Sequence, residues 1–419
     1  MRRKVSLEEA QQLLLERTHP TGECGVALLE ASGRVLSQDI FAPINIPTFA
    51  KSALDGYALI ATDTIGAEKS RPALLNVIDE TRAGYSAREK VVPGTAIKLM
   101  TGSPIPAGAD VVIKYEDIVR NGDVISIFQP LKAHDNIIPA GEDIKEGELA
   151  ATEGTVINSA LIALLAGLGI YRVPVYKQPK VAIMSTGDEL MLPGEPLQAG
   201  KTYNSSLFGL LARCAELGCS TIDLGIAPDN IHTISARIAR GLEEADIIIS
   251  TGGVSVGDYD VVKEAMVDAG AEIIFWQVAM KPGSPMVGAA KGKQILAGLS
   301  GNPAAAMVTF DLIVVPVLRK MMGMKNPLPN KIQGIFSETF KKASPQRRML
   351  RARLEKRDNV DCFCLTGNQN NGAMASMVDC NVLLDIPAGS GALTPGQKVV
   401  GHIVGNISSA FNNISEPIS

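Results

Sequence analysis

Hydrophobic residues between positions 178 and 323 follow two alternating patterns. Short apolar runs, which are typical of buried strands, alternate with segments in which apolar residues recur every three to four positions, as in amphipathic helices. The runs that predict strands are 181–184, 221–226, 246–250 and 272–278, and the segments that predict helices are 206–217, 231–244 and 261–269. This alternation predicts βαβ units around a parallel sheet.

The pattern differs on the N-terminal side of this region. It predicts a helix at 7–17 that begins at Ser6, a second helical piece that ends at Gly33, and an extended segment at 39–47, where prolines exclude a helix. Short strands and tight turns then predict a mostly β module from Ser52 to about Pro139.

Helical periodicity returns at 158–168 and again at 304–318. The second of these stretches is very apolar, but Asp311 and Pro316 interrupt it and it is short for a membrane span, so we expect a buried helix. Beyond residue 329 the pattern is β-like without a long helix after Glu355, which predicts a small all-β domain.

Composition and charge narrow the possible functions. The 419 residues are too many for one core, and a net charge of −4 gives no global basic field for nucleic acid or an anionic membrane. The six cysteines form no C-x-x-C pair, so we expect reduced thiols in a cytoplasmic protein and no zinc site. The basic start of the chain precedes a helix cap instead of an apolar signal core.

Two glycine-containing loops follow predicted strands and carry acids. Glycines let a backbone approach a ligand, free N–H groups favour an anion, and a nearby carboxylate often meets magnesium that bridges to phosphate. The first loop contributes Gly252, Gly253, Ser255, Gly257, Asp258 and Asp260, and the second contributes Gly187, Asp188 and Glu189. Each loop could also be only a turn or a capped helix start, but both leave the same sheet edge if their strands are parallel.

Two further loops in this region bring a cation and small polar groups. One contains Lys281, Gly283 and Ser284, and the other contains Gly301 and Asn302 before a long helix. Lys281 could pair with phosphate or another oxyanion, although a lone lysine beside proline and glycine is more often solvated.

Seven motifs, in this order along the chain, resemble the molybdopterin molybdenumtransferases, the family that includes the C-terminal domain of gephyrin. They are Ser-x-x-Asp-Gly-Tyr-Ala at 52–58, Met-Thr-Gly-x-Pro-x-Pro-x-Gly-Ala-Asp at 100–110, Gly-Glu-Asp-Ile at 141–144, Ser-Thr-Gly-Asp-Glu-Leu at 185–190, Gly-Gly-Val-Ser-Val-Gly at 252–257, Lys-Pro-Gly at 281–283 and Gly-Asn-Pro at 301–303.

The resemblance implies a multidomain α/β and β fold of four domains. A split N-terminal domain (1–45 plus 140–177) carries an inserted β-rich domain (46–139), and a central parallel-sheet molybdopterin-binding domain (178–325) precedes a small C-terminal β-barrel-like domain (326–419). The family works as a homodimer whose cleft joins one subunit's molybdopterin-binding domain to the other's β module. This gives Asp55, Thr101 and Asp143 a place in the site.

The resemblance also implies a reaction. Family members insert molybdenum from molybdate into adenylylated molybdopterin and release AMP, with Mg²⁺ as cofactor. By motif match, the carboxylates are Asp188, Glu189, Asp229, Asp258 and Asp260, with Glu189, Asp258 and Asp260 as metal ligands, and the cations are Lys281 and Arg351. Expected partners are the molybdopterin adenylyltransferase and molybdoenzyme maturation proteins. Tungstate in place of molybdate is equally compatible with the sequence.

Four positions depart from the family pattern. Ser284 stands where the family usually has a second lysine, Ser300 replaces a proline, an arginine expected near Ile138 has no counterpart, and the last domain's Gly-Ser turn contains Asn371. Two of these changes remove positive charge that would pair with an oxyanion. These missing charges favour one alternative to the insertase, a carrier or scaffold that binds a molybdopterin species or a protein without inserting metal. A second alternative, which nothing in the sequence requires, is a different phosphoanhydride hydrolase or nucleotidyl-group enzyme on the same sheet.

Overall fold

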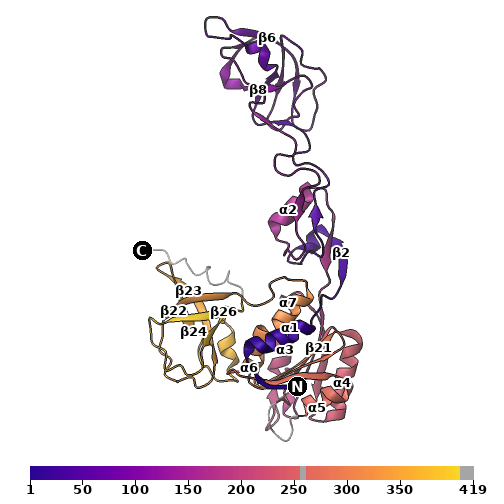
Figure 1. Cartoon of the computed structure of the whole chain (residues 1–419), viewed down its shortest axis with the longest axis vertical. Helices are drawn as coiled ribbons and strands as arrows, with labels where there is room; N and C mark the ends of the chain where they lie inside the picture. Colours follow the sequence, from indigo (N-terminus) through magenta and orange to yellow (C-terminus); the bar gives the residue numbers. More distant parts are fainter. Residues whose placement is uncertain (255–260, 406–419) are drawn as a thin grey trace. The chain divides into compact units, whose positions relative to one another are not determined.

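A computed structural model describes residues 1–254 and 261–405 of the chain (Figure 1). It divides into two compact units, one made of Met1–Cys24 and Val175–Ser419 and the other of Gly25–Pro174. The chain passes between the units within strands β2 (Glu23–Ala27) and β13 (Arg172–Tyr176), which pair with each other.

A seven-stranded sheet forms the centre of the first unit. Its strands lie in the order β1 (Arg2–Val5), β19 (Glu272–Val278), β20 (Met286–Lys291), β21 (Gln294–Leu299), β18 (Ile247–Thr251), β14 (Lys180–Thr186) and β17 (Ser220–Ala227). The predicted parallel arrangement is confirmed for β17, β14 and β18, and β21, which the sequence pattern did not predict, continues it. The predicted strand at 272–278, β19, belongs to the same sheet but pairs parallel only with β1 and antiparallel with β20. Strand β20 runs antiparallel to both of its neighbours. The two-residue turn at Gly292 and Lys293, which joins β20 to β21, is too short for a parallel crossover.

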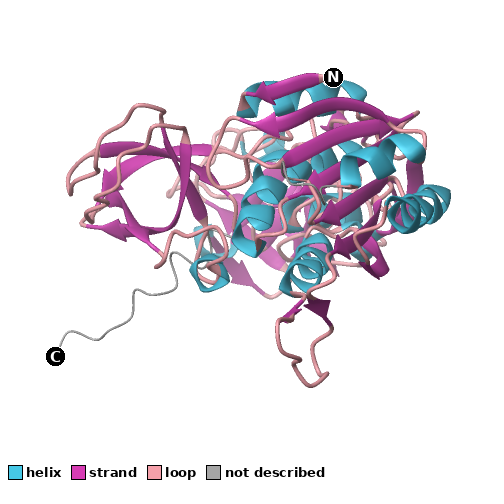
Figure 2. Ribbon diagram, turned by 90° about the horizontal axis from the view of Figure 1, so that it is seen from below, coloured by secondary structure: helices cyan, strands magenta, loops and turns pink. Residues whose placement is uncertain are grey.

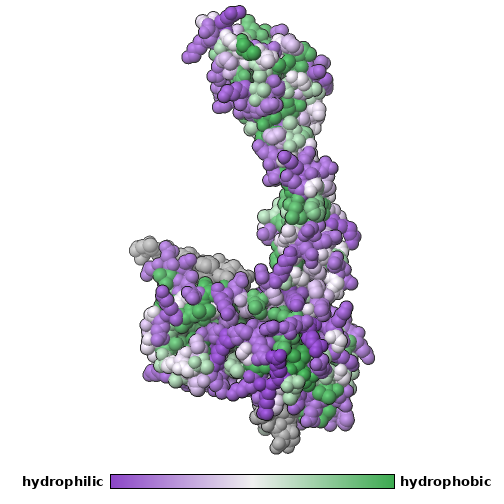
Figure 3. All heavy atoms as spheres, in the orientation of Figure 1, coloured by the Kyte–Doolittle hydropathy of each residue, from purple (hydrophilic) through white to green (hydrophobic). Residues whose placement is uncertain are grey.

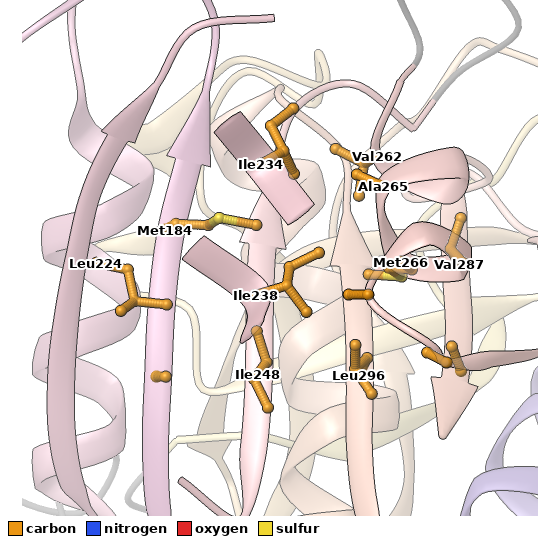
Figure 4. Packing of buried hydrophobic residues seen from close by; sticks show 14 of the residues in the cluster. Met184, Leu224, Ile234, Ile238, Ile248, Val262, Ala265, Met266, Val287 and Leu296 are labelled. Atoms are coloured by element: carbon orange, nitrogen blue, oxygen red, sulfur yellow. The ribbon is translucent and has the colours of Figure 1, made fainter. Parts of the chain in front are cut away.

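Helices cover both faces of this sheet. Helices α4 (Ile231–Glu244) and α5 (Val262–Asp268) enclose one apolar core, in which Met184, Ile238 and Met266 are fully buried (Figure 4). Helix α3 (Ser205–Glu216) packs on β14 and β17, α6 (Pro303–Thr309) on β21, and α1 (Leu7–Arg17) on β19 and β20. The connection through α3 and the one through α4 run in opposite directions along the sheet, which places right-handed crossovers on opposite faces.

Polar residues begin these helices at the positions that the sequence indicates. The hydroxyl of Ser6 accepts the N–H of Glu9 at 3.0 Å, and the side chain of Asn230 accepts the N–H of Thr233 at 3.1 Å. The predicted helices at 7–17 and 231–244 are confirmed. The Glu9 carboxylate pairs with Arg2 on strand β1, a strand that the sequence pattern did not predict.

The predicted buried helix at 304–318 is interrupted in its middle. It consists of α6, a π-helical turn (Phe310–Val314) and α7 (Val315–Met321). Asp311 lies in that turn and accepts the Nε–H of Arg213 at 3.0 Å, while its burial raises its pKa to about 6. Among the described residues, no helix is long and apolar enough to cross a membrane.

A closed five-stranded barrel follows in the same unit and confirms the small C-terminal β domain (Figure 2). Its strands lie in the order β22 (Lys331–Phe336), β24 (Val360–Leu365), β23 (Arg348–Arg357), β25 (Val382–Ile386) and β26 (Lys398–Ile403). Alternate residues of these strands, including Leu350, Phe363 and Leu384, fill its interior. The turn β23–β24 uses Asp358 and Asn359, both in the left-handed region that a two-residue hairpin requires.

The second unit contains the predicted β module and a smaller region around it. The module is a six-stranded sheet in the order β8 (Val111–Lys114), β5 (Gly56–Leu59), β7 (Thr95–Leu99), β6 (Ala73–Thr81), β10 (Val124–Ile127) and β9 (Ile118–Asn121). Outside it lie the pairs β4 (Lys51–Ser52) with β11 (Ile137–Ile138) and β3 (Ile40–Phe41) with β12 (Leu149–Ala151), and helix α2 (Ser159–Gly167).

The second helical piece expected before Gly33 is wrong in most of its length. Residues 23–27 form strand β2, and only Leu28–Ala31 form a 3₁₀ turn. The reason is that β13 offers a strand partner, whereas an isolated helix of so few residues does not stabilise its own nucleus.

A charged cluster joins the barrel to the α/β domain. Arg347 donates to both carboxylate oxygens of Asp385 on β25, at 2.7 Å and 2.6 Å, and to both oxygens of Glu8 on α1, at 2.7 Å and 2.8 Å. Burial opposes ionisation of Asp385, but hydrogen bonds from Arg347 and His402 outweigh it and hold the pKa of that carboxyl well below its usual range. The same arginine lowers the pKa of Glu8.

We expect this cluster to make the free energy of unfolding depend on pH in the acidic range. Both carboxyls have a lower pKa when folded, so their stabilisation is complete above the unfolded values near pH 4 and is lost as pH falls through the folded values. Arg347→Met should cost about 2 kcal/mol at pH 7, which lowers the melting temperature by about 4–8 °C. The difference from the wild type should shrink below pH 4 in calorimetry. The matched control is Arg17→Met, which removes an exposed pair with Glu272 and should change little. A loss that is equal at pH 7 and pH 3 would contradict this role.

Candidate active site

A pocket of about 240 Å³ lies at the carboxyl ends of the four parallel strands. Its lining residues come from the loops after β14, β17, β18 and β21 and from the segment before β20: Thr186, Gly187, Glu189, Asp229, Gly252, Gly253, Val254, Pro285, Ser300, Gly301 and Asn302. The chain leaves β14 toward one face of the sheet and leaves β18 toward the other. The pocket therefore occupies the switch point where open α/β sheets bind ligands.

Glycines bring these loops into close contact. A Cβ atom on Gly252, whose φ is +92°, would lie 2.4 Å from the backbone oxygen of Thr186, and one on Gly301 would lie 3.3 Å from the Cα of Gly252. A side chain at Gly252 would therefore separate the loop after β18 from the loop after β14. Gly252 therefore serves the packing of a tight turn, as the first interpretation of this loop holds. The pocket lies where the packed loops meet.

Glu189 is a pocket-lining acid from the first of the two predicted loops. Its carboxylate lies over Gly187, where a Cβ atom would come within 2.4 Å of Oε2. The backbone N–H of Gly187 donates to Ala227 at the end of β17, at 3.2 Å. The predicted convergence of the loops after β14 and β18 is confirmed, because both line this pocket. Asp188 is exposed and is not among the residues that line it.

Several predicted site residues fall where the structure gives no description. Ser255, Gly257, Asp258 and Asp260 lie outside the described residues. Within the described part of the chain, no three histidine, cysteine or acidic residues gather as a metal site. Glu189 and Asp229 are the described acids of the pocket lining, so the full ligand set for a cation stays a prediction.

A buried hydroxyl network holds the two loops on the sheet. The hydroxyls of Ser185 and Thr251 lie 2.8 Å apart, and Ser185 also donates to the side-chain oxygen of Asn204 at 3.1 Å. Asn204 caps α3 by accepting the N–H of Leu207 at 3.2 Å. This network was not predicted from the sequence, although hydroxyl groups at the ends of otherwise apolar strands were a usable signal.

A second pocket, of about 540 Å³, lies between the α/β domain and the barrel within the first unit. It shares Asn302 with the first pocket, so the two adjoin. Its lining residues are Lys281, Asn302, Phe340, Lys342, Arg348, Leu365, Gly367, Asn368, Gln369, Asn370, Asn371 and Gly372. Every charged residue among them is a cation, and amide groups supply most of the remaining polar atoms.

Arg351, predicted as a cation for the substrate, is fully buried beneath the loop of this second pocket. Its guanidinium donates to the backbone oxygens of Asn368 and Asn370, both at 3.0 Å, and to the hydroxyl of Ser376 at 2.6 Å. Burial lowers the pKa of Arg351, but a guanidinium stays charged at neutral pH. It therefore fixes the shape of the loop and adds positive potential from below.

The loop that carries Lys281 packs tightly against α6. A Cβ atom on Gly283, whose φ is +93°, would lie 2.3 Å from the side chain of Thr309. Ser284 accepts the N–H of Val278 with its backbone oxygen at 2.9 Å. Neither Gly283 nor Ser284 is among the residues that line the two pockets, so their predicted substrate contact stays a prediction.

The remaining predicted residues lie in the second unit. Thr101 donates its backbone N–H (2.6 Å) and its hydroxyl (2.8 Å) to one oxygen of Asp55. The backbone hydrogen bond, followed by the hydroxyl, lowers the pKa of this exposed carboxyl. Asp143 is also exposed and donates its backbone N–H to Ile46 at 3.0 Å. The structure thus joins Asp55 with Thr101, and the carboxylates of Asp55 and Asp143 are both exposed to solvent.

Two cations of the second pocket, Lys342 and Arg348, were missed by the sequence analysis. The available signal was the cluster of basic residues on both sides of Pro345 in a chain whose net charge is negative. Spacing alone did not say that this cluster would face Lys281, because the contact depends on how the barrel packs on the α/β domain.

Comparison with known proteins agrees with this architecture. Residues 5–169 match the MoeA N-terminal region (domain I and II), residues 182–320 match the probable molybdopterin binding domain, and residues 333–400 match the MoeA C-terminal region (domain IV). A molybdopterin biosynthesis MoeA protein from Pyrococcus horikoshii has a solved structure with a TM-score of 0.80 and 31% identity, covering 96% of this chain and all of that one.

Curated relatives cover the same length. The molybdopterin molybdenumtransferase of Staphylococcus epidermidis is 33% identical over 417 residues, which is 100% of this chain and 98% of that protein. That of Bacillus subtilis is 33% identical over 378 residues, which is 89% of this chain and 88% of that protein. The chain therefore belongs to the molybdopterin molybdenumtransferase family of enzymes.

Proposed function

We propose that this enzyme acts in molybdenum-cofactor biosynthesis, inserting molybdenum from molybdate into adenylylated molybdopterin with release of AMP in a Mg²⁺-dependent reaction. The observation that carries the proposal is the acidic pocket at the switch point of the sheet, in a chain that matches molybdopterin molybdenumtransferases along its length. A paired cationic pocket beside it supports a reaction with two anionic reactants.

The pocket chemistry suits a phosphoanhydride and a cation. Glu189, with Asp260 and Asp258 from the adjoining loop, would hold Mg²⁺, which takes oxygen ligands and keeps contact with substrate phosphates. Bound there, the cation would neutralise charge on the leaving phosphate. Gly252 and Gly253 leave room for the substrate to approach the backbone.

Molybdate would lie in the second pocket, near Lys281. Asn302 lines both pockets, so the phosphoanhydride and the oxyanion would be neighbours, as metal insertion coupled to hydrolysis requires. The proposed small and polar contacts around the phosphoanhydride and the oxyanion are Gly283, Ser284, Gly301 and the amides of the 367–372 loop.

Glu189 provides the direct test. Glu189→Gln keeps the size of the side chain and removes its charge, so single-turnover AMP release should fall by at least about 100-fold, or roughly 3 kcal/mol of transition-state stabilisation. Its dependence on Mg²⁺ should weaken as well, and Asp260→Asn should behave in the same way. The matched control is Glu195→Gln, an exposed acid farther along the same segment. Wild-type AMP release by Glu189→Gln, or full rates without added metal, would rule out this role.

A carrier or scaffold is the second candidate, and the missing lysine at Ser284 favours it. Such a protein would bind the pterin without releasing AMP. Incubation of the purified enzyme with adenylylated molybdopterin, Mg²⁺ and molybdate separates the two, because only the insertase forms both AMP and the molybdenum cofactor. A parallel incubation with tungstate tests the identity of the oxyanion.

We also propose that the enzyme works as a homodimer in the cytoplasm, with four domains divided as the family resemblance implies. The adenylyltransferase that makes its substrate and maturation proteins that receive its product are the proposed partners. An apolar surface on helix α2 supports self-association: the helix has no charged residue, and only Leu165 is buried within its unit. Figure 3 shows an apolar patch over this part of the chain.

The patch contains a groove of about 490 Å³ beside α2, lined by residues that include Leu149, Val156, Leu161 and Leu164. Leu149 and Val156 are 48% and 45% exposed. Contiguous exposed apolar side chains of this kind mark association surfaces.

Disruption of this surface should give monomers. Leu161→Glu places a charge on a half-exposed position, so it should leave the fold intact and prevent burial of the patch. Light scattering should report half the wild-type mass. Lys69→Glu is the matched control, because it changes an exposed residue of the same unit outside the patch. A Leu161→Glu protein with the wild-type mass would contradict this choice of interface.

Subunit mixing tests whether the site is shared between subunits. By family resemblance, Asp55 and Thr101 of one subunit serve the sheet pocket of the other. An Asp55→Asn subunit mixed with a Glu189→Gln subunit should then recover about a quarter of wild-type AMP release, because half of the dimers are mixed and each has one intact site. Absence of any recovery, with confirmed subunit exchange, would show that each chain works alone.

A further inference from the structure

Arg348 has no role in the proposed function, yet it forms a pair of like charges with Lys281 in the lining of the second pocket. Lys281 and Arg348 form a parallel β-bridge: the N–H of Lys281 donates to Arg347 at 2.9 Å, and the N–H of Met349 donates to the oxygen of Lys281 at 2.8 Å. Bridged strands lie about 5 Å apart, and residues in register present their side chains on one side. Both side chains line the same pocket.

Arg348 is held in place rather than free to turn away from Lys281. Its Nε–H donates to the hydroxyl of Ser344 at 3.1 Å, Nη2 lies 3.4 Å from the oxygen of Ala343, and its guanidinium stacks on Phe340 at 5.3 Å from the ring centroid. Ser344 and Phe340 are themselves buried. The geometry of the guanidinium is therefore set before any ligand arrives.

The pocket lacks a counter-charge among the residues that the structure describes. Lys342 is a third cation of the lining, Arg351 lies buried beneath the loop, and no acidic residue lines the space. Neither Arg348 nor Arg351 has an ion pair with a described carboxylate. Like charges placed opposite each other destabilise a strand pair, so this arrangement makes physical sense when an anion lies between them.

We propose that Arg348, together with Lys281, forms an oxyanion clamp that binds molybdate, so that the C-terminal barrel supplies the positive charge that Ser284 does not. The inference deepens the proposed function, on which it rests, because it adds Arg348, an oxyanion contact that the family resemblance does not assign. The guanidinium presents a planar fork to two oxygens of a tetrahedral anion, and the ammonium of Lys281 neutralises the opposite side.

A backbone hydrogen bond ties the amide loop of the barrel to the α/β domain. The backbone N–H of Ala305, near the start of α6, donates to Asn371 at 3.1 Å, which fixes the amide loop over the α/β domain. With Arg351 holding that loop from below and Ser344 holding Arg348, the barrel side of the clamp is ordered, while Lys281 is exposed. An anion that binds there therefore has to order the Lys281 side chain but not the Arg348 side chain.

The test measures molybdate binding to the full-length protein by calorimetry, without pterin. Arg348→Gln should weaken molybdate binding about 10- to 100-fold, which is the usual loss for one charge-assisted contact. Arg348→Lys should bind with an affinity between those of the wild type and Arg348→Gln, because it keeps the charge but loses the planar pair of donors. Lys342→Gln, at an exposed position, should lose up to about fivefold. The matched control is Arg357→Gln, which removes an exposed arginine from the far end of the same strand and should not change binding.

The outcomes separate the clamp from the proposed reaction. Arg348→Gln that melts like the wild type and binds molybdate within twofold of it would overturn the clamp, while AMP release by the wild type would still support insertion. If the wild type binds molybdate and Arg348→Gln does not, but the wild type releases no AMP, the result would support the clamp and reject insertion. Absence of saturable molybdate binding by the wild type would overturn the clamp, whatever the turnover assay shows.

Discussion

Parallel pairing of β14 with β18 is the constraint on which the candidate site depends. The two strands run in register from Val181 opposite Ile247 to Ser185 opposite Thr251, and nearly every residue in them is buried. Strands as apolar as these bury the side chains of both faces only when they lie in the centre of a sheet that is covered on both sides. Because they end at the same level, Gly187, Glu189 and the 252–254 turn reach one pocket, and the buried Ser185–Thr251 contact holds them there.

The charge of the molecule is arranged locally rather than globally. A chain with a net charge of −4 places acids at the end of the sheet and cations on the neighbouring barrel, with Asn302 between them. Lys281 belongs to the α/β domain, whereas Arg348 and Arg351 belong to the barrel. In the proposed function, this separation of the two signs would let one pocket hold a cation and its neighbour hold an oxyanion without mutual neutralisation.

Burial decides what each positive group does. Arg351 and Arg348 are three residues apart on β23, yet the first is fully buried under the amide loop and the second lines the open pocket. Odd separation along a strand places side chains on opposite faces, which explains the difference. The motif drew attention to Arg351, which the structure places beneath the amide loop, while the half-buried Arg348 lines the pocket itself. Similarly, Arg347 faces Glu8 and Asp385 and joins the domains instead of meeting a ligand.

By itself, the sequence determined the helices of the α/β domain and four of the seven strands in its sheet, together with the barrel-like end, the family and the two converging loops. Local periodicity and ordered motifs carry that information, and β14, β18 and α4 formed within a residue or two of their predicted bounds because buried strands and capped helices specify themselves locally. The tertiary structure alone decided that 23–27 is a strand, that β20 reverses direction and that Lys281 faces Arg348. Each of these depends on a partner distant in sequence, and neither periodicity nor spacing encodes which segment that partner will be.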